Sequence, residues 1–381
     1  MYSEEIKLFL NFIKSVVSET TAVEVEKKQL PIIYMLAQKQ GLIHMLALAC
    51  KRQGLLGEDA LSEELKKSIR KTLLRYEIFA AEEQQIYAQL ERAKIGYVPL
   101  KGSVIRSHYK EPWLRTSNDI DVLVKETDVE RAKELLQNEL GYELIKNNYH
   151  DIALRSPSNI VVELHFTITE NEPSMDRMLG QVWEHVHPVE EQSYRYEMEP
   201  EFLFFHVMAH MLYHFKHGGC GVRFFIDLWI LQGALAIDMQ KVNTWFQACE
   251  MDVFAEHVMH LAAIWFGEGM HDEVSISMQE YILNGGLYGT TQSKVMAQKA
   301  NAKGEATYLF QRVFQPYREL AAAYPTLRKH PWLYPYYTIC RWTKLLRVSE
   351  AKKAKEELSI SKDTNADRVK ALAELFQTLN I

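Results

Sequence analysis

The sequence contains no closely spaced cysteine pair. Its four cysteines are scattered along 381 residues, at Cys50, Cys220, Cys249 and Cys340. This pattern indicates neither a zinc ribbon nor a disulfide framework. We therefore expect reduced thiols and a cytoplasmic protein.

The sequence also lacks a long uncharged apolar run and an overall basic charge. No uncharged stretch approaches the length that spans a bilayer, and the opening segment MYSEEIKLFLNFIK lacks the basic start and long apolar core of a signal peptide. The net charge is −6, so the overall basic character of many nucleic-acid-binding proteins is missing, although local basic patches stay open. With 47% hydrophobic and 25% charged residues, the composition is that of a globular protein, long enough for about two or three domains.

Helix-forming sequence flanks a short segment in which strands and helices alternate. Residues 1–94 carry apolar residues at helical spacing and many good helix formers. Between 95 and 173 the pattern is strand, short helix, strand, an amphipathic helix ending at Gly141, and three short strands. From 174 to 381 it is helical again. We expect an α+β fold, with a small mixed β-sheet core (95–173) flanked by an N-terminal helical region and a C-terminal helical domain.

Two aspartates stand at the start of the apolar run SNDIDVLV, residues 117–124. Alternate residues of a strand point to one face, so Asp119 and Asp121 project together. In the later run IVVELHF the same alternation places Glu163 and His165 on one face. Carboxylates this close repel one another and are costly to bury unless a cation is present. Mg²⁺, which prefers oxygen ligands, would resolve this. An edge strand with its aspartates in water is the alternative.

A Gly-Ser pair precedes the aspartates, in the stretch PLKGSVIRSHY. Gly102 and Ser103 lie where a predicted strand turns into a predicted helix. Free backbone N–H groups and a hydroxyl at such a turn favour phosphate, and glycine allows close approach. Any turn can contain Gly-Ser, however, and the P-loop pattern GxxxxGK[ST] is absent.

The combination of these motifs resembles the DNA polymerase β-type nucleotidyltransferase superfamily. Within it, the pattern is similar to that of a bacterial family of uncharacterised nucleotidyltransferases, with the signature LKG…R…DIDLLV…GY…ELHW. This sequence has LKGS, Arg115, DIDVLV, LGY and ELHF between about residues 95 and 168. Phe166 stands where tryptophan is common in that family. The later stretch HVMAH…RFFIDLWIL is similar to the family's helical C-terminal region.

The resemblance implies roles for these residues. Asp119 and Asp121 would bind two Mg²⁺ ions, with Mn²⁺ as an alternative, and Glu163 would complete one metal site and help activate the attacking group. Gly102 and Ser103 would hold the triphosphate. The reaction would transfer a nucleoside monophosphate from an NTP to an acceptor hydroxyl and release pyrophosphate. The acceptor is left open between a small molecule, a protein and an RNA end.

Four further residues are candidates beside these motifs. Lys101 and Arg115 flank them and are candidates for phosphate contacts, with a solvated surface charge as the alternative. Arginine in particular suits bidentate phosphate binding. His165 is a candidate for orienting Glu163, and His150 begins the preceding predicted strand. Both histidines are also consistent with a place in the core.

A stripe of histidines follows in the first helix of the C-terminal region. His206, His210 and His214 recur at every fourth position, and His217 comes just after them. We expect this helix to pack beside the active cleft, with His206 or His210 on the acceptor side. A zinc site, which needs such a face and a fourth ligand, is the alternative.

Arg223 and Asp227 lie four residues apart in the next predicted helix. This is the spacing of an ion pair along one helix face. We expect the two residues to brace the interface between the helical domain and the sheet.

Residues 326–355 combine many Lys and Arg residues with interleaved Trp and Tyr. Such a combination is found on surfaces that bind single-stranded nucleic acid. An ordinary packed helix junction with its lysines in water also explains it, and we favour this second interpretation. Nucleic acid is therefore an open but not a favoured partner.

Two other functions stay open at this point. One is a glycosyltransferase that uses the DxD motif to hold a metal and a nucleotide sugar. In those enzymes the motif usually ends an apolar strand, whereas Asp119 and Asp121 begin theirs. The other is an inactive homologue that serves as a binding or scaffold protein. The presence of the Gly-Ser turn and of all three acids argues against it.

Overall fold

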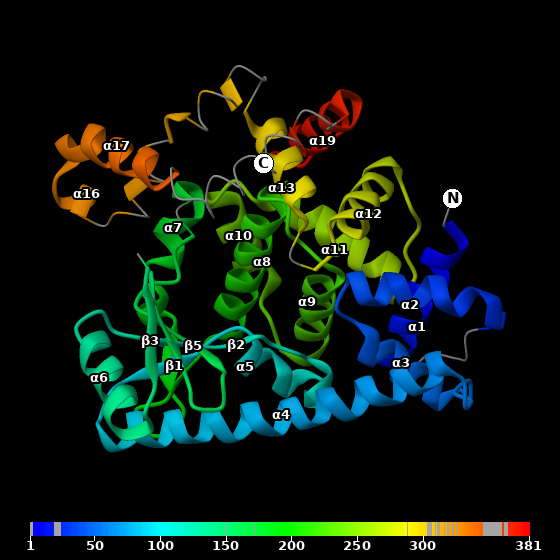
Figure 1. Ribbon diagram of the computed structural model, residues 1–381, viewed down its shortest axis with the longest axis horizontal. Helices are drawn as coiled ribbons and strands as arrows, with labels where there is room; N and C mark the ends of the chain where they lie inside the picture. Colours follow the sequence, from blue (N-terminus) through cyan, green and yellow to red (C-terminus); the bar gives the residue numbers. More distant parts are fainter. Residues whose placement is uncertain are drawn as a thin grey trace.

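The computed structural model describes residues 3–18, 24–148, 150–170, 172–287, 289–302, 307–308, 310, 313–315, 317, 320–321, 324, 326–345, 360–361 and 365–381. Helices lie before, within and after a central sheet (Figure 1). Those before the sheet are α1 (Ser3–Val17), η1 (Lys27–Gln29), α2 (Leu30–Lys39), α3 (Ile43–Arg52) and α4 (Ala60–Arg92). Those after it include α7 (Pro173–Leu179), η4 (Val182–Glu184), α8 (Pro200–Lys216), α9 (Val222–Ala234), α10 (Met239–Ala248), α11 (Asp252–Phe266), α12 (Glu273–Gly285), α13 (Thr291–Asn301), α16 (Thr326–Lys329), η5 (Pro331–Leu333), α17 (Tyr334–Leu345) and α19 (Ala366–Thr378).

The sheet has five strands in the order β1-β2-β5-β4-β3. They are β1 (Tyr97–Pro99), β2 (Asp119–Val124), β3 (Glu143–Asn147), β4 (Asp151–Arg155) and β5 (Val161–His165), and they alternate with α5 (Gly102–Ile105), η2 (Arg106–His108), η3 (Pro112–Leu114) and α6 (Val129–Leu140). Strands β2 and β5 are parallel, and the other neighbours are antiparallel. The α+β prediction, with a small mixed sheet flanked by helices, is confirmed.

Local sequence signals explain the bounds of two of these helices. The Asp59 side chain caps the first turn of α4 by accepting a hydrogen bond from the backbone of Ser62 at 3.0 Å, and good helix formers then fill the helix. Helix α6 ends at Gly141, whose φ of +69° is the left-handed conformation that glycine adopts without strain. Both helices lie where the sequence predicts them.

The two faces of the sheet have different roles. Ile120, Val122 and Val124 of β2 lie in a buried cluster that also contains residues of α4 and α6, such as Ile86 and Leu136. In Figure 1, α4 runs beneath the sheet and α8 and α9 stand above it. Because alternate residues of a strand point to opposite faces, Asp119 and Asp121 project away from α4.

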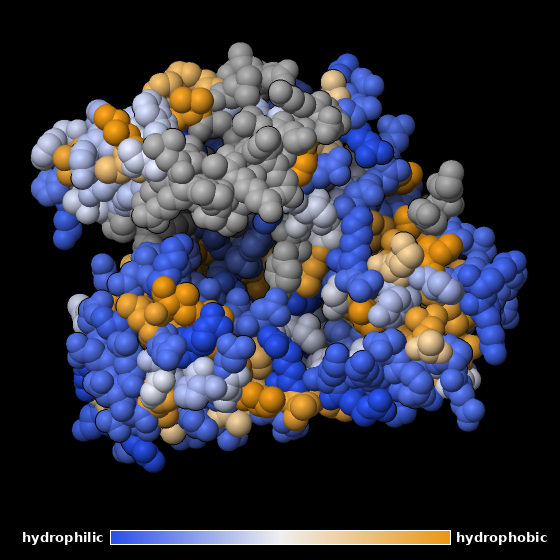
Figure 2. Space-filling model, in the orientation of Figure 1, coloured by the Kyte–Doolittle hydropathy of each residue, from blue (hydrophilic) through white to orange (hydrophobic). Residues whose placement is uncertain are grey.

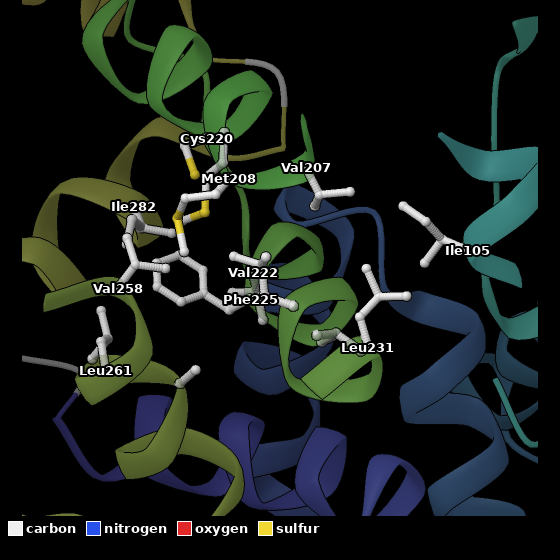
Figure 3. Close-up of a cluster of buried hydrophobic side chains, with 14 of the residues drawn as sticks. Ile105, Val207, Met208, Cys220, Val222, Phe225, Leu231, Val258, Leu261 and Ile282 are labelled. Carbon is white, nitrogen blue, oxygen red and sulfur yellow. The ribbon is translucent and has the colours of Figure 1, made fainter. Parts of the chain in front are cut away.

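A larger hydrophobic cluster joins helices from both ends of the chain. It contains residues of α1–α3 and of α8–α12, and α1 packs against both α3 and α11. Figure 3 shows its part around Phe225 of α9, with Val258 and Leu261 of α11 and Ile282 of α12 nearby. The helices above the sheet therefore pack on a continuous apolar core. The predicted boundaries between the N-terminal helical region, the sheet core and the C-terminal helical domain stay predictions.

The region after residue 174 is not wholly helical, contrary to the prediction. Residues 186–198 form a short antiparallel hairpin of β6 (Val186–Pro188) and β7 (Tyr196–Met198). The hairpin is anchored to the edge of the main sheet, where Tyr97 of β1 forms a bridge with Arg195. Strands of three residues are too short to show an alternating sequence pattern, so the sequence could not predict them. Their contact with β1 stabilises them instead.

Hydrophilic residues cover most of the face in view over the sheet and α4 (Figure 2). Hydrophobic patches interrupt it along the lower edge, where α4 exposes Leu74 and Ile78. Among the described helices, none is long and apolar enough to cross a membrane. All four cysteines are free thiols, and the cytoplasmic location stays a prediction.

Candidate active site

The acidic residues of the two parallel strands meet at the centre of the sheet. Strands β2 and β5 pair so that Asp121 lies directly beside Glu163, and Asp119 beside Val161. Asp121 is buried and Asp119 and Glu163 are half-buried, and all three line the cavity above the sheet. The strands thus bring Glu163 beside two aspartates that lie more than forty residues earlier in the sequence.

These carboxylates differ in the charge they carry. Burial, and then the neighbouring charge of Asp121, raise the pKa of Asp119 to about 6. Burial would also raise the pKa of Asp121, but the Lys101 ammonium and a hydrogen bond with His165 outweigh it and hold that pKa well below its ordinary value. Asp121 therefore stays ionised at a lower pH than Asp119 does.

The Lys101 side chain lies inside this acidic group. Its Nζ is 3.1 Å from Asp121 Oδ1. Burial would lower the pKa of Lys101, but the charges of Asp121, Glu170 and Glu163 outweigh it and raise that pKa. The backbone of Lys101 has φ +44° and ψ −116°, a strained conformation for a residue with a Cβ. Strain of about 1–3 kcal/mol of this kind is concentrated at functional sites. The predicted phosphate contact of Lys101 stays a prediction.

The Gly-Ser turn lies between β1 and α5, as the sequence predicts, and the phosphate roles of Gly102 and Ser103 stay predictions. Ser103 is not among the residues that line the cavity. Its hydroxyl donates to Glu83 of α4 at 2.7 Å, and its backbone N–H donates to the Leu100 carbonyl at 3.1 Å. Gly102 does line the cavity, so in the observed conformation Gly102 is the residue of this pair that can contact a phosphate there.

Gly102 is packed tightly against the loop that leads into β2. A Cβ at this position would lie 1.9 Å from Ser117 Oγ and 3.2 Å from Ser117 Cβ. Ser117 is itself buried and lines the cavity. The glycine therefore leaves room for the Ser117 side chain, in addition to any role with phosphate.

We expect Gly102→Ala to destabilise the fold by about 1–3 kcal/mol, because the new methyl group overlaps Ser117. Urea unfolding followed by circular dichroism measures this. Ser117→Gly in the same chain should recover most of the loss. The control is Gly233→Ala in α9, where nothing lies within 4 Å of an added Cβ; it should be neutral or slightly stabilising. Equal stabilities of Gly102→Ala and the wild type would contradict the overlap.

Arg115 is held by an aspartate from the helical region. Its Nε donates to Asp227 Oδ1 at 2.8 Å and to Oδ2 at 3.0 Å, and both side chains are buried. Tyr109 donates its hydroxyl to the same Oδ1 at 2.6 Å. Both Arg115 and Asp227 line the cavity. Asp227 thus joins α9 to the segments before β2.

The neighbouring arginine of α9 also contacts the sheet region. Arg223 Nη1 donates to the Thr116 carbonyl at 2.9 Å, and Arg223 lines the cavity. The predicted contact between the helical domain and the sheet is therefore confirmed, but Asp227 makes it with Arg115 and Tyr109.

His165 lies at the end of the acidic row. Its Nε2 is 2.9 Å from Asp121 Oδ1 and 3.4 Å from Glu163 Oε2. Among the described residues, Asp121, Glu163 and His165 form the one group of three potential metal ligands whose atoms all lie within 4.8 Å of one another. His150 stacks on the His165 ring at a centroid distance of 5.6 Å, and its Nε2 is 2.8 Å from Asp151 Oδ1. His165 thus contacts two of the three carboxylates, but neither His165 nor His150 is among the residues that line the cavity.

The predicted histidine stripe forms the opposite wall of the cavity. His206, His210 and His214 of α8 all line it. Burial lowers the pKa of His206 to about 3 and that of His214 to about 2, so both are neutral. His217 lies at the end of the helix, with Nδ1 2.7 Å from the Tyr213 carbonyl oxygen. The stripe does not form a group with metal-ligand spacing among the residues that the structure describes.

A fourth carboxylate, which the sequence analysis missed, contacts the histidine wall of the cavity. Glu170 Oε1 is 2.6 Å from His210 Nδ1. Burial would raise the pKa of Glu170, but the charge of His210 outweighs it and lowers that pKa to about 2. Glu170 lies in an irregular segment, so no periodicity could have indicated it. Ser117 and Asn118, which also line the cavity, could have been found from their place directly before Asp119.

The cavity itself has a volume of about 260 Å³. Its residues are Lys101, Gly102, Ile105, Arg115, Ser117, Asn118, Asp119, Asp121, Glu163, His206, Val207, His210, His214, Arg223, Phe224 and Asp227. Carboxylates of the sheet thus face cationic and imidazole groups of the helices. Such a cavity suits a ligand that carries both a bound cation and negative charge.

The basic and aromatic run lies apart from this cavity. Its described part, residues 326–345, contributes no residue to the lining, and residues 346–355 lie outside the described residues. Trp332 and Tyr336 are exposed, and the Tyr337 ring packs against that of Tyr324 in a tilted arrangement, with the centroids 4.5 Å apart. Nucleic-acid binding by this run stays a prediction.

Comparison with known proteins gives one match. The sequence model of a family described as "Uncharacterised nucleotidyltransferase" matches residues 27–267, which include the whole sheet and the helices from α2 to α11. No curated protein and no solved structure matches the chain.

Proposed function

Because the chain belongs to the uncharacterised nucleotidyltransferase family, we propose that it transfers a nucleoside monophosphate from an NTP to an acceptor hydroxyl. In this reaction the acceptor oxygen forms a bond to the α-phosphorus, the bond from that phosphorus to pyrophosphate breaks, and the hydroxyl loses its proton. The family supports nucleotidyl transfer in general, and the residue roles below are our proposal.

One observation carries the proposal. Asp121 and Glu163 lie side by side on parallel strands, and with Asp119 they present three carboxylates to a single cavity. The donor set fits a hard divalent cation, because oxygen ligands from carboxylates are what Mg²⁺ and Mn²⁺ bind. In the observed structure the ammonium of Lys101, 3.1 Å from Asp121 Oδ1, balances part of this negative charge.

Asp119, Asp121 and Glu163 are the residues proposed to hold two Mg²⁺ ions, with Mn²⁺ as the alternative. When bound, such ions neutralise charge on the triphosphate and on the attacking and leaving oxygens. Glu163, half-buried at the edge of the cavity, is the carboxylate proposed to receive the proton of the acceptor hydroxyl. Orientation and charge neutralisation account for most catalysis in reactions of this class.

The cationic side of the cavity is proposed to bind the phosphates and the acceptor. Gly102, Ser103, Lys101 and Arg115 are proposed to contact the triphosphate. All of them except Ser103 line the cavity in the observed structure. His206 and His210 stand on the other wall, where the acceptor would enter. Arg115 is held firmly by Asp227, so it is a preorganised donor and needs little reordering on binding.

Binding of labelled ATP, GTP, CTP and UTP in Mg²⁺ and in chelator tests the nucleotide half of the proposal. We expect Mg²⁺ or Mn²⁺ to increase NTP affinity at least about tenfold, because the ion joins the carboxylates to the phosphates. Equal affinity with and without the metal would contradict the assignment. Release of UDP from a nucleotide sugar would favour a glycosyltransferase.

Incubation with α-labelled NTPs and cell extract tests the acceptor half. Label should appear in a small-molecule, protein or RNA fraction, together with one pyrophosphate for each nucleotide transferred. Heat-inactivated protein is the control. Label that remains in free nucleotide in every fraction would argue against transfer and for a nucleotide-binding protein.

A further inference from the structure

Lys101 holds the place of a cation beside the acids of the sheet. Its Nζ lies 3.1 Å from Asp121 Oδ1, and His165 Nε2 lies 2.9 Å from the same oxygen. The Asp121 and His165 side chains are each 5% exposed, and that of Lys101 is 23% exposed. Asp121 Oδ1 is therefore already paired with two nitrogen atoms in the observed structure.

The ammonium of Lys101 stabilises the site in its metal-free form. Carboxylates that lie close together repel one another unless positive charge is present, and Glu170 and Glu163 attract the ammonium in addition to Asp121. A divalent ion at the same carboxylates gains their attraction, but it also meets the like charge of the ammonium. A metal ion that binds without nucleotide must therefore displace a favourable ion pair.

Of the two nitrogen partners, Lys101 is the one that can move. Its ammonium ends a flexible four-carbon stem, so the ammonium can change partners while the backbone of the turn keeps its conformation. The His165 ring has a short stem and is buried on strand β5, so we expect it to stay beside Asp121. Lys101 also lines the cavity together with Gly102, which can contact a phosphate there. A bound triphosphate would thus offer new partners to the ammonium.

We propose that Lys101 is an internal counter-ion, which occupies the cation position beside Asp121 until a metal–nucleotide complex binds and then moves to the triphosphate. The inference rests on the proposed function, because it takes Asp121 as a metal ligand and an NTP as the substrate. The phosphate oxygens replace Asp121 as partners of the ammonium, whereas a metal ion without nucleotide offers it no replacement. Metal alone should therefore bind weakly, and metal and triphosphate should strengthen the binding of each other.

Lys101→Met tests this proposal, because methionine keeps the length of the side chain and removes its charge. We expect Mn²⁺ alone, followed by electron paramagnetic resonance, to bind at least about tenfold more tightly to this variant than to the wild type. Inorganic tripolyphosphate in Mg²⁺, followed by calorimetry, should bind at least about tenfold more weakly. The matched control is Lys125→Met, which removes an exposed lysine just after β2 that does not line the cavity. This control should change both affinities by less than about twofold.

The outcomes separate this inference from the proposed function. Opposite shifts of the two affinities would support the counter-ion, since partial unfolding would weaken both. Unchanged or weaker Mn²⁺ binding by Lys101→Met would overturn the counter-ion and leave the carboxylate site. Tighter Mn²⁺ binding with an unchanged tripolyphosphate affinity would overturn the movement to the triphosphate. Absence of Mn²⁺ binding by the wild type and the variant, with or without tripolyphosphate, would overturn both this inference and the metal site of the proposed function.

Discussion

Asp121→Asn is expected to lower nucleotidyl transfer at least about 10³-fold, equivalent to about 4 kcal/mol of transition-state stabilisation. Asp121 is the buried carboxylate of the row, it stays ionised, and it is central to the proposed metal site. Asparagine keeps the shape of the side chain but removes the charge that a divalent ion needs. The assay is pyrophosphate release, with Mn²⁺ affinity measured in parallel.

The matched control for this variant is Glu126→Gln. Glu126 follows β2, is exposed, and does not line the cavity, so its loss of charge should leave activity within about twofold. Circular dichroism and urea unfolding of both variants separate loss of chemistry from loss of fold. Wild-type pyrophosphate release and Mn²⁺ affinity in Asp121→Asn would contradict the proposal that Asp121 is a metal ligand.

Asp227→Ala is expected to destabilise the fold by about 3–5 kcal/mol. Asp227 is 2% exposed and accepts hydrogen bonds from both Arg115 and Tyr109. Its removal leaves the buried guanidinium of Arg115 without its principal counter-charge, and an uncompensated buried charge costs this much. The contact also joins α9 to the segments before β2, so transfer activity should fall with stability. Urea unfolding measures the change in the free energy of unfolding.

Two further variants interpret this result. Asp227→Asn keeps an acceptor for Tyr109 and Arg115 and should lose less stability than Asp227→Ala. Glu256→Ala removes an exposed carboxylate on α11 and should change stability by no more than about 0.5 kcal/mol. A loss of stability below about 1 kcal/mol for Asp227→Ala would mean that water replaces the carboxylate. The Asp227–Arg115 ion pair would then not stabilise the contact between α9 and the segment before β2.

The sequence alone predicted the parts of the fold that depend on local regularity. The alternation in SNDIDVLV placed Asp119 and Asp121 on one face and Ile120, Val122 and Val124 on the other, as the structure has them. Helix α4 and the end of α6 at Gly141 followed from helix propensity and capping. These features depend on hydrogen bonds and side-chain periodicity within one segment, so the residues of that segment are enough to predict them.

The tertiary structure decided which side chains meet. Strand pairing put Glu163 beside Asp121, and the packing of α8 and α9 over the sheet brought Glu170 to His210 and Asp227 to Arg115, more than one hundred residues away in sequence in the last case. It also turned the Ser103 hydroxyl towards Glu83, although the residue type fits a phosphate turn. Periodicity predicts the face of an element on which a side chain lies, but the residue that it contacts depends on how whole elements pack. The candidate site residues could therefore be identified from the sequence, whereas their side-chain contacts depend on the tertiary structure.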